Sequence, residues 1–231
     1  MSVLRLASIW LTLALGSSAM AAPAPASELE AVLDRMDAAA ASFRNAEADF
    51  VWDQYQRVVQ ETDTQKGKVY FRRRGQETQM AAEITVPDRK YVLFADGKVR
   101  LYQPRIDQVT EYSTGKNKNE VESFLVLGFG GRGHDLLKSF EVRHAGSEMI
   151  EGVKTARLEL QPKTQRMRGV FERIVLWIDP ERGVSLRQQF FEPSGDYRLA
   201  HYNNIRLNQP VAEEVFRLKT TSKTKFVNPQ G

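Results

Sequence analysis

The 231-residue sequence contains no cysteine and only three histidines. Without cysteine, disulfide scaffolds, thiolate zinc sites, cysteine nucleophiles and thiol redox chemistry are all excluded. The three histidines, His134, His144 and His201, share no helix-face spacing of the HExxH kind. We therefore expect neither a metal site nor a cofactor.

The sequence also has little excess charge and no hydrolase motif. Its 33 basic residues exceed the 29 acidic ones by four, and the two signs are interspersed, which disfavours nucleic-acid binding. No serine lies in a GxSxG context. The run Gly128 to Gly133 (GFGGRG) follows a helical pattern and lacks the GKS or GKT of a phosphate loop, so it predicts a flexible hinge. No catalytic residue is predicted, and we do not expect an enzyme.

The only apolar run of note is at the N-terminus. Met1 to Arg5 is a short basic start, Leu6 to Leu15 is apolar, and Ala19-Met20-Ala21 has a small-x-small cleavage pattern. Ten apolar residues form a helix of about 15 Å, half the hydrocarbon core of a membrane. We therefore predict a cleaved signal peptide over residues 1–21 and secretion of the mature chain.

The predicted mature chain, residues 22–231, has no further membrane signal. No cysteine follows the cleavage site, so the lipid anchor of a bacterial lipoprotein is excluded. No later stretch approaches 18 consecutive apolar residues. We expect a mature protein that is free in solution.

The mature chain begins with a helical pattern and continues with a period of two. Ser27 stands three residues before Glu30, as in a capping box, and Leu29 to Phe43 carries one apolar stripe, which predicts an amphipathic helix. Alternating apolar residues then predict strands. Thr62 to Gly67 (TDTQKG) predicts a turn, and Asp96-Gly97 predicts a hairpin of type I′.

The alternation stops between Gly115 and Lys138. This insert predicts two short helices around the glycine-rich run, with Asp135 or His134 capping the second. Alternation returns after Phe140. One helix, about five strands, an insert and about five more strands predict a single α+β domain with one antiparallel sheet. We expect that sheet to be curved or to form an unclosed barrel, because ten flat strands would leave long edges.

Two features of the predicted sheet leave alternatives open. The cluster Arg72-Arg73-Arg74 fits a solvated turn at a strand end. It also fits a structure in which one arginine turns inward and donates hydrogen bonds to carbonyls of another element. The many large apolar side chains fit an ordinary core, or a cavity between sheet and helices that holds a lipid.

Four segments, taken in order, resemble a known family. GKVYFRRRG (67–75) is similar to the family's GxLxxxRP segment, and YVLFADGKVRLY (91–102) is similar to its DGKxLWxY hairpin. Phe124 to Leu127 occupies the place of its apolar lid helix, and Phe171 to Phe190 resembles a strand pair near its C-terminal end. With the signal peptide, the helix and a strand over 46–59, the whole mature chain resembles the outer-membrane lipoprotein carrier family, LolA.

The resemblance implies an unclosed antiparallel barrel, covered by short helices, around a cavity for lipoprotein acyl chains. By its position in GxLxxxRP, Arg73 matches the family arginine that latches the closed lid through hydrogen bonds to backbone carbonyls of the helical insert. The sequence departs from the family where Arg74 replaces the usual proline and where Gln76 to Gln79 replaces an aromatic-rich stretch. From these departures we expect the fit of the cargo or the behaviour of the lid to differ from that of the family.

The resemblance also implies a function and a set of site residues. It predicts a monomeric periplasmic carrier that takes lipoproteins from an inner-membrane ABC exporter to an outer-membrane acceptor. A regulatory or sensor module like the periplasmic sensor RseB and a carrier of another periplasmic lipid are the alternatives. Besides the latch, the predicted roles are a lid face and a cavity wall. The lid face comprises Phe124, Leu125 and Leu127, and the wall comprises Phe50, Trp52 and Phe71.

Overall fold

The computed structural model describes residues 27–75, 77–115 and 124–229. The predicted signal peptide, Gln76 and residues 116–123 of the predicted insert lie outside the described residues. Twelve strands form one sheet in the order β12-β6-β5-β4-β3-β2-β1-β11-β10-β9-β8-β7. All neighbours pair antiparallel except β12 with β6, which pair in parallel.

Among the described residues, α1 and β1 to β6 come first along the chain, and α3, α4 and β7 to β12 follow. The elements are α1 (Glu28–Ser42), β1 (Asn45–Gln56), β2 (Glu61–Arg74), β3 (Glu77–Val86), β4 (Lys90–Ala95), β5 (Lys98–Gln103), η1 (Pro104–Ile106), β6 (Gln108–Ser113), α3 (Gly133–Ser139), β7 (Phe140–Ile150), β8 (Val153–Pro162), α4 (Gln165–Arg168), β9 (Arg173–Asp179), β10 (Val184–Phe191), β11 (Tyr197–Leu207), η3 (Glu213–Phe216) and β12 (Lys225–Val227).

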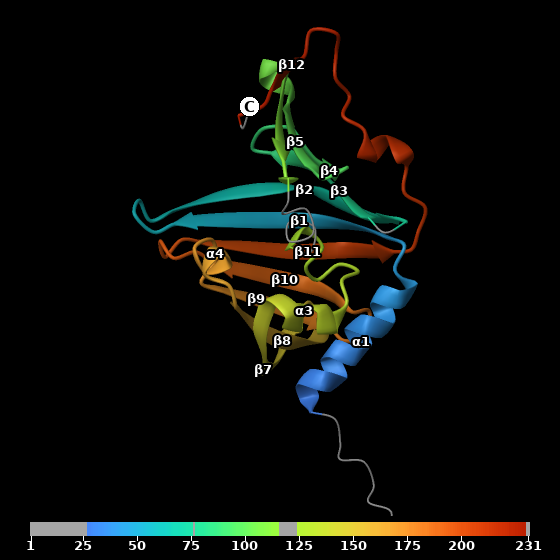
Figure 1. Cartoon of the computed structure of the whole chain (residues 1–231), viewed down its shortest axis with the longest axis vertical. Helices are drawn as coiled ribbons and strands as arrows, with labels where there is room; N and C mark the ends of the chain where they lie inside the picture. The colour runs from blue at the N-terminus through green and yellow to red at the C-terminus, as the bar shows by residue number, and fades with distance from the viewer. Residues whose placement is uncertain (1–26, 76, 116–123, 230–231) are drawn as a thin grey trace, which may run out of the picture.

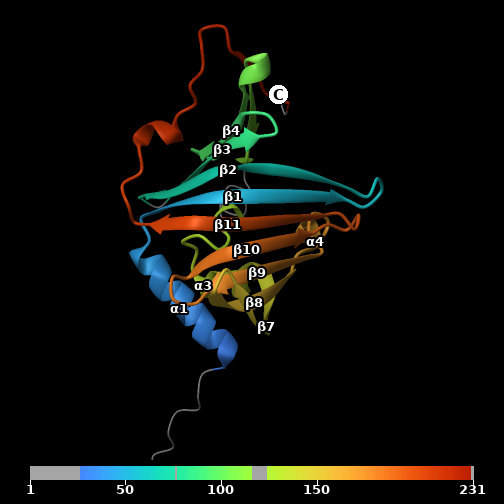
Figure 2. The same cartoon turned by 180° about the vertical axis from the view of Figure 1, so that it is seen from behind.

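The sheet is curved and remains open. In Figure 1, the long strands β1, β2 and β11 cross the middle, with β3 to β6 above them and β7 to β10 below. The same arrangement is seen from behind in Figure 2, where α1 again lies beside the lower half of the sheet. The two ends of the sheet, β12 and β7, do not pair with each other. This arrangement confirms the predicted α+β class and the unclosed antiparallel barrel.

Helix α1 forms as its apolar stripe and its cap predict. The hydroxyl of Ser27 accepts the backbone N–H of Glu30 at 3.2 Å, which satisfies one of the free donors of the first turn. Four side chains of the stripe are buried: Val32, Leu33, Met36 and Ala40. Val32, Leu33 and Met36 pack on Leu127, Leu136 and the inner side chains of β8 and β9, in the larger core under the lower half of the sheet.

The predicted turn over Thr62 to Gly67 is wrong, because these residues belong to β2 and pair with β1. The turn lies instead at residues 57–60. Polar pairs hold the exposed strand ends together, since the Thr64 hydroxyl donates to Asp53 at 2.6 Å. Gly67 marks a register shift against β3, where an added Cβ would lie 1.9 Å from the Glu83 carbonyl oxygen. The glycine thus permits a close approach of two strands rather than a reversal of the chain.

The Asp96-Gly97 hairpin is confirmed, because both central residues have positive φ, 55° and 68°. The predicted cap of the second insert helix is wrong. Arg132, rather than Asp135 or His134, occupies the N-cap of α3, and its side chain makes no capping bond. The carboxylate of Asp37 on α1 accepts the backbone N–H of His134 at 3.2 Å instead. A neighbouring helix therefore supplies the acceptor that the local sequence does not.

The outer face of the upper half is covered by the C-terminal segment that contains η3. Phe216 of η3 is buried against Ala81, Leu93 and Ala95 of β3 and β4. In Figure 1 this segment runs along the outside of the sheet before β12 joins β6. Among the described residues, no helix is long and apolar enough to cross a membrane.

Candidate functional site: an apolar cavity beneath a latched lid

An apolar cavity of about 340 Å³ lies on the concave side of the sheet. Its walls come from the six strands β1, β2, β3, β4, β10 and β11, from two residues of the insert and from the segment before β9. Sixteen residues line it: Phe50, Trp52, Val69, Phe71, Met80, Ala82, Ile84, Val92, Phe124, Leu125, Phe171, Gln188, Phe190, Arg198, Ala200 and Tyr202. Aliphatic and aromatic side chains predominate, so the cavity favours an apolar ligand.

Strand alternation and register place these side chains on one face. Phe50 and Trp52 are two residues apart on β1, and their partners on β11 are Tyr202 and Ala200. On the other side of β1, Phe71 of β2 pairs with Met80 of β3, which also lines the cavity. The alternation of apolar residues that predicts the strands therefore also places the wall residues on one face of the sheet.

The cavity is closed on one side by residues 124–134, which we call the lid segment. Two phenylalanines anchor it to the sheet. The ring of Phe124 stacks on Phe171 with centroids 4.9 Å apart. The ring of Phe129 stacks on Phe71 at 4.7 Å and meets Tyr202 edge to face at 4.9 Å. These geometries are the ones that aromatic pairs prefer, so both contacts favour the closed position.

Backbone carbonyls of the lid segment bind donors from the sheet. The side-chain amide of Gln188 donates to the carbonyl of Leu127 at 2.5 Å. The backbone N–H of Ser185 donates to the carbonyl of Gly128 at 2.9 Å. Both donors belong to β10, so the lid segment is fastened to one strand of the lower half.

Arg73 makes a third attachment, which joins the lid segment to α1. Its guanidinium donates to the carbonyl of Gly130 and to the carbonyl of Ala40, each at 2.9 Å. It also lies 5.7 Å above the ring of Phe43. A single planar guanidinium therefore bridges the last turn of α1, the lid segment and the end of β2.

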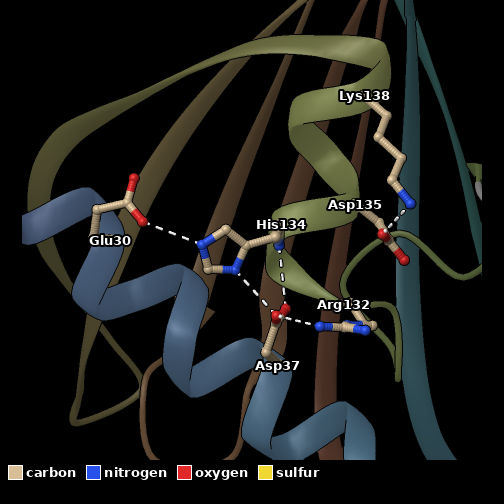
Figure 3. Close-up of polar contacts among 6 residues, drawn as sticks. All are labelled: Glu30, Asp37, Arg132, His134, Asp135 and Lys138. Atoms are coloured by element: carbon tan, nitrogen blue, oxygen red, sulfur yellow. Dashed lines mark hydrogen bonds and ion pairs between the residues drawn. The ribbon is translucent and has the colours of Figure 1, made fainter.

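A polar cluster ties the end of the lid segment to the exposed side of α1 (Figure 3). The carboxylate of Asp37 lies 3.0 Å from Arg132 Nη2 and 3.0 Å from His134 Nδ1. The other ring nitrogen of His134, Nε2, lies 3.1 Å from a carboxylate oxygen of Glu30. Two carboxylates of one helix thus hold one imidazole from both sides.

These contacts shift the pKa values of His134 and Asp37. Hydrogen bonds with Glu30 and then Asp37 raise the pKa of His134 above its ordinary value, because both carboxylates favour the imidazolium. Burial alone would raise the pKa of Asp37, but its hydrogen bonds with Arg132 and His134 outweigh burial and lower it. The protonated histidine and the ionised carboxylate of Asp37 stabilise one another.

The glycines of the lid segment allow close packing in the position that the structure shows, and a hinge at this run stays a prediction. Gly130 has a φ of +73°, and an added Cβ would lie 2.4 Å from the ring of Phe43. At Gly133 an added Cβ would lie 2.6 Å from the carbonyl oxygen of Leu33 on α1. Only a residue without a side chain lets the insert approach α1 this closely.

The structure brings most of the predicted site residues together. Five of the seven line the cavity: Phe50, Trp52, Phe71, Phe124 and Leu125. Leu127 lies outside the cavity, because it is buried in the lower core with Leu33 and Leu136. Arg73 also lies outside and bonds the lid segment. The roles of these residues in binding stay predictions.

Two contributors were not predicted. Gln188 is 4% exposed and Phe129 is 1% exposed, and both fasten the lid segment. The sequence does contain a signal for Gln188, because this polar residue stands two positions before Phe190 and therefore on the inward face of β10. Phe129 gives no comparable signal, because a phenylalanine between glycines fits an exposed loop equally well.

The polar groups that touch the cavity are few. Burial raises the pKa of the Tyr202 phenol, which remains neutral and donates to Gln188 Oε1 at 3.3 Å. Within residues 27–75, 77–115 and 124–229, no group of three acidic or histidine side chains is arranged to hold a metal ion.

The fold and the site define a class of proteins in which an open half-barrel and a short lid enclose an apolar cavity. The family model described as outer membrane lipoprotein carrier protein LolA matches residues 41–219, which is most of the chain. The chain belongs to the LolA family. No curated protein matches the sequence significantly.

Solved structures show the same fold at low sequence identity. An uncharacterized conserved protein from Thermus thermophilus is 13% identical, with a TM-score of 0.54 over 86% of this chain and 98% of that one. MucB is also 13% identical, with a TM-score of 0.54 over 84% of this chain and 64% of its own. This chain therefore spans less than two thirds of the MucB chain. A structure of the MucA/MucB complex of Pseudomonas aeruginosa is 13% identical, with a TM-score of 0.50, over 83% of this chain and 61% of the matched one.

Proposed function

We propose that the protein is a soluble periplasmic carrier that binds the acyl chains of lipoproteins and moves them from the inner to the outer membrane. Residues 22–231 form one carrier domain in this proposal, secreted with the signal peptide predicted over residues 1–21. The observation that carries the proposal is the apolar cavity beneath a lid segment that polar contacts hold closed. Membership of the LolA family supports it.

Such a carrier must offset a large free-energy cost of exposing acyl chains to water. A triacylated anchor has roughly 45 methylene groups, and exposing each to water costs about 0.8 kcal/mol. The total reaches tens of kcal/mol, so unassisted transfer through water is negligible. A cavity of about 340 Å³ is small for three chains. Loading therefore requires the lid segment to move away from the sheet.

The attachments of the lid segment suit a carrier that must also release. They are a few hydrogen bonds, each worth about 1 kcal/mol, three aromatic contacts and the polar cluster around Asp37. Several weak attachments can be exchanged for contacts with a chain without unfolding the sheet. In this proposal the lid opens as the cargo enters, and the protein has no catalytic role. An inner-membrane ABC exporter supplies the cargo, and an outer-membrane acceptor receives it.

A release assay tests the proposal. Spheroplasts that retain a labelled triacylated lipoprotein in their outer leaflet are incubated with the purified mature chain. We expect the lipoprotein to appear in the supernatant as a one-to-one complex. A supernatant without lipoprotein, under conditions in which the exporter is active, would contradict the proposal.

A matched pair of variants makes the assay specific for the cavity. Ala200→Phe places a ring inside the cavity, because Ala200 lines it opposite Trp52. Leu199→Phe adds a ring one residue away, on the other face of β11. We expect the first variant to release much less lipoprotein and the second to behave as the unaltered chain. Equal release by both would show that the cavity is not the binding site.

A regulatory module is the second candidate, and the likeness to MucB favours it, since MucB has been solved in complex with MucA. In such a module, lipid binding would alter an association with a protein partner. A carrier of a different periplasmic lipid is the third candidate. It would share the cavity and differ only in cargo.

A further inference from the structure

Arg198 is the one charged side chain among the described residues that line the apolar cavity. It lies on β11 in the same alternating row as Ala200 and Tyr202, which also line the cavity. Its cross-strand partners are Phe190 on β10 and Gln54 on β1. Strand geometry therefore places the guanidinium of Arg198 on the concave face, two residues along β11 from Ala200.

The hydrogen-bonding capacity of Arg198 is only partly used. Its Nη2 lies 2.8 Å from Glu192 Oε1, and the guanidinium carbon lies 6.0 Å from the centre of the Phe171 ring. Its Nε is buried and has no hydrogen-bond partner in the part of the chain that the structure describes. A guanidinium has five N–H donors in a planar fork that matches carboxylate and phosphate oxygens.

The side chain also remains accessible, since 34% of it is exposed while Glu192 is 22% exposed. A charge that lies beside apolar walls is costly unless oxygen atoms compensate it. One carboxylate supplies part of this compensation. An anionic head group whose chain lies in the cavity would supply the rest.

We propose that the cavity also binds amphiphiles with an anionic head group, a carboxylate or a phosphate, with Arg198 binding the head and the apolar walls holding the chain. This inference rests on the proposed acyl-chain site and adds a second class of ligand to it. The chains of a lipoprotein anchor are joined by ester and amide bonds, which carry no charge. A cationic residue at the cavity therefore discriminates in favour of anionic lipids, and Glu192 competes with them for it.

The test compares ligands with the same chain and different heads. Dissociation constants are measured by calorimetry on the delipidated mature chain for palmitate, palmitoyl lysophosphatidylglycerol and monopalmitoylglycerol. We expect both anionic ligands to bind at least about tenfold more tightly than the neutral one, because hydrogen bonds between charged groups are stronger than those to a neutral head group. A preference for only one anionic ligand identifies the head group as carboxylate or phosphate.

Three variants assign the preference to a residue. Arg198→Gln should bind all three ligands alike, and Glu192→Gln should increase the preference for anionic ligands because the competing carboxylate is gone. Arg173→Gln is the matched control, because Arg173 belongs to β9, which β10 separates from β11, and stacks on Phe191 with its guanidinium 4.1 Å from the ring centre. It should leave the preference unchanged.

Two outcomes would overturn the inference. In the first, the unaltered chain binds charged and neutral ligands equally, which leaves the acyl-chain site standing. In the second, the preference persists in Arg198→Gln or does not respond to Glu192→Gln. If Arg198→Gln fails to fold, Glu192→Gln decides alone. Failure of every amphiphile to bind, charged or neutral, would contradict the proposed function itself.

Discussion

Arg72 and Arg73 are adjacent in sequence and serve opposite faces of the sheet. Arg72 points outward, where it pairs with Glu213 at 2.6 Å and covers the ring of Phe216. Arg73 points inward and bonds the carbonyls of Ala40 and Gly130. The difference follows from the alternation of side chains along a strand. Two arginines that resemble one basic patch in sequence therefore make separate contacts on opposite faces of the sheet.

Arg73→Leu should leave the fold intact and impair cargo transfer. The change removes two hydrogen bonds of an exposed guanidinium, so we expect the free energy of unfolding to fall by only about 1–2 kcal/mol. Transfer should suffer more, because the lid segment loses one of its connections to α1. Urea unfolding and the release assay measure the two effects. Arg74→Leu is the control, and an unchanged transfer rate in Arg73→Leu would contradict the latch.

The histidine cluster gives a pH dependence with a definite sign. Because hydrogen bonds with Glu30 and Asp37 raise the pKa of His134, its contribution to stability is complete below the ordinary value of about 6.5. That contribution is lost as the pH rises through the raised value. The free energy of unfolding of the unaltered chain should therefore exceed that of His134→Gln at pH 5.5, and the difference should shrink toward pH 8.5. A difference that does not change with pH would contradict this account.

At the scale of elements, the lid segment is held mainly through its backbone carbonyls. Gln188→Leu leaves the buried carbonyl of Leu127 without the donor that it has now. An unsatisfied buried carbonyl costs about 1–3 kcal/mol, so we expect a lower urea midpoint and faster amide exchange in residues 124–134. Gln189→Leu, on the other face of β10, is the control. Equal stability of the two variants would show that the bond to Gln188 contributes nothing.

The close approach of α1 and α3 provides a second test at this scale. A Cβ at residue 133 would lie within 2.7 Å of two Leu33 backbone atoms, whereas at Gly131 the nearest atom is 3.6 Å away. Gly133→Ala should therefore destabilise the protein by about 1–3 kcal/mol, as overpacking does. Gly131→Ala should be close to neutral. Thermal unfolding of both variants measures the difference, and a stable Gly133→Ala protein would mean that the two helices separate at no cost.

The sequence predicts the elements whose patterns are local. The helix expected over residues 29–43 forms over Glu28–Ser42, because its apolar stripe and Ser27 cap act within a few residues. The Asp96-Gly97 turn forms because its backbone angles depend on those two residues. The turn predicted at Thr62 to Gly67 fails, because pairing with β1 overrides the polar composition.

The site is less predictable than the fold. The wall residues Phe50, Trp52 and Phe71 follow from strand alternation once the inward face is fixed. The cap of α3 by Asp37 depends on a contact between residues 97 positions apart, which no local pattern contains. The position of Leu127 in the core rather than in the cavity likewise depends on how the insert packs against α1.

At the scale of the whole molecule, the central claim is that the half-barrel binds its cargo through acyl chains. Native mass spectrometry of the mature chain, mixed with one lipoprotein in acylated and in unacylated form, tests this most directly. We predict a one-to-one complex with the acylated form and none with the unacylated form. Binding of both forms alike would contradict the carrier and favour a regulatory module that recognises protein.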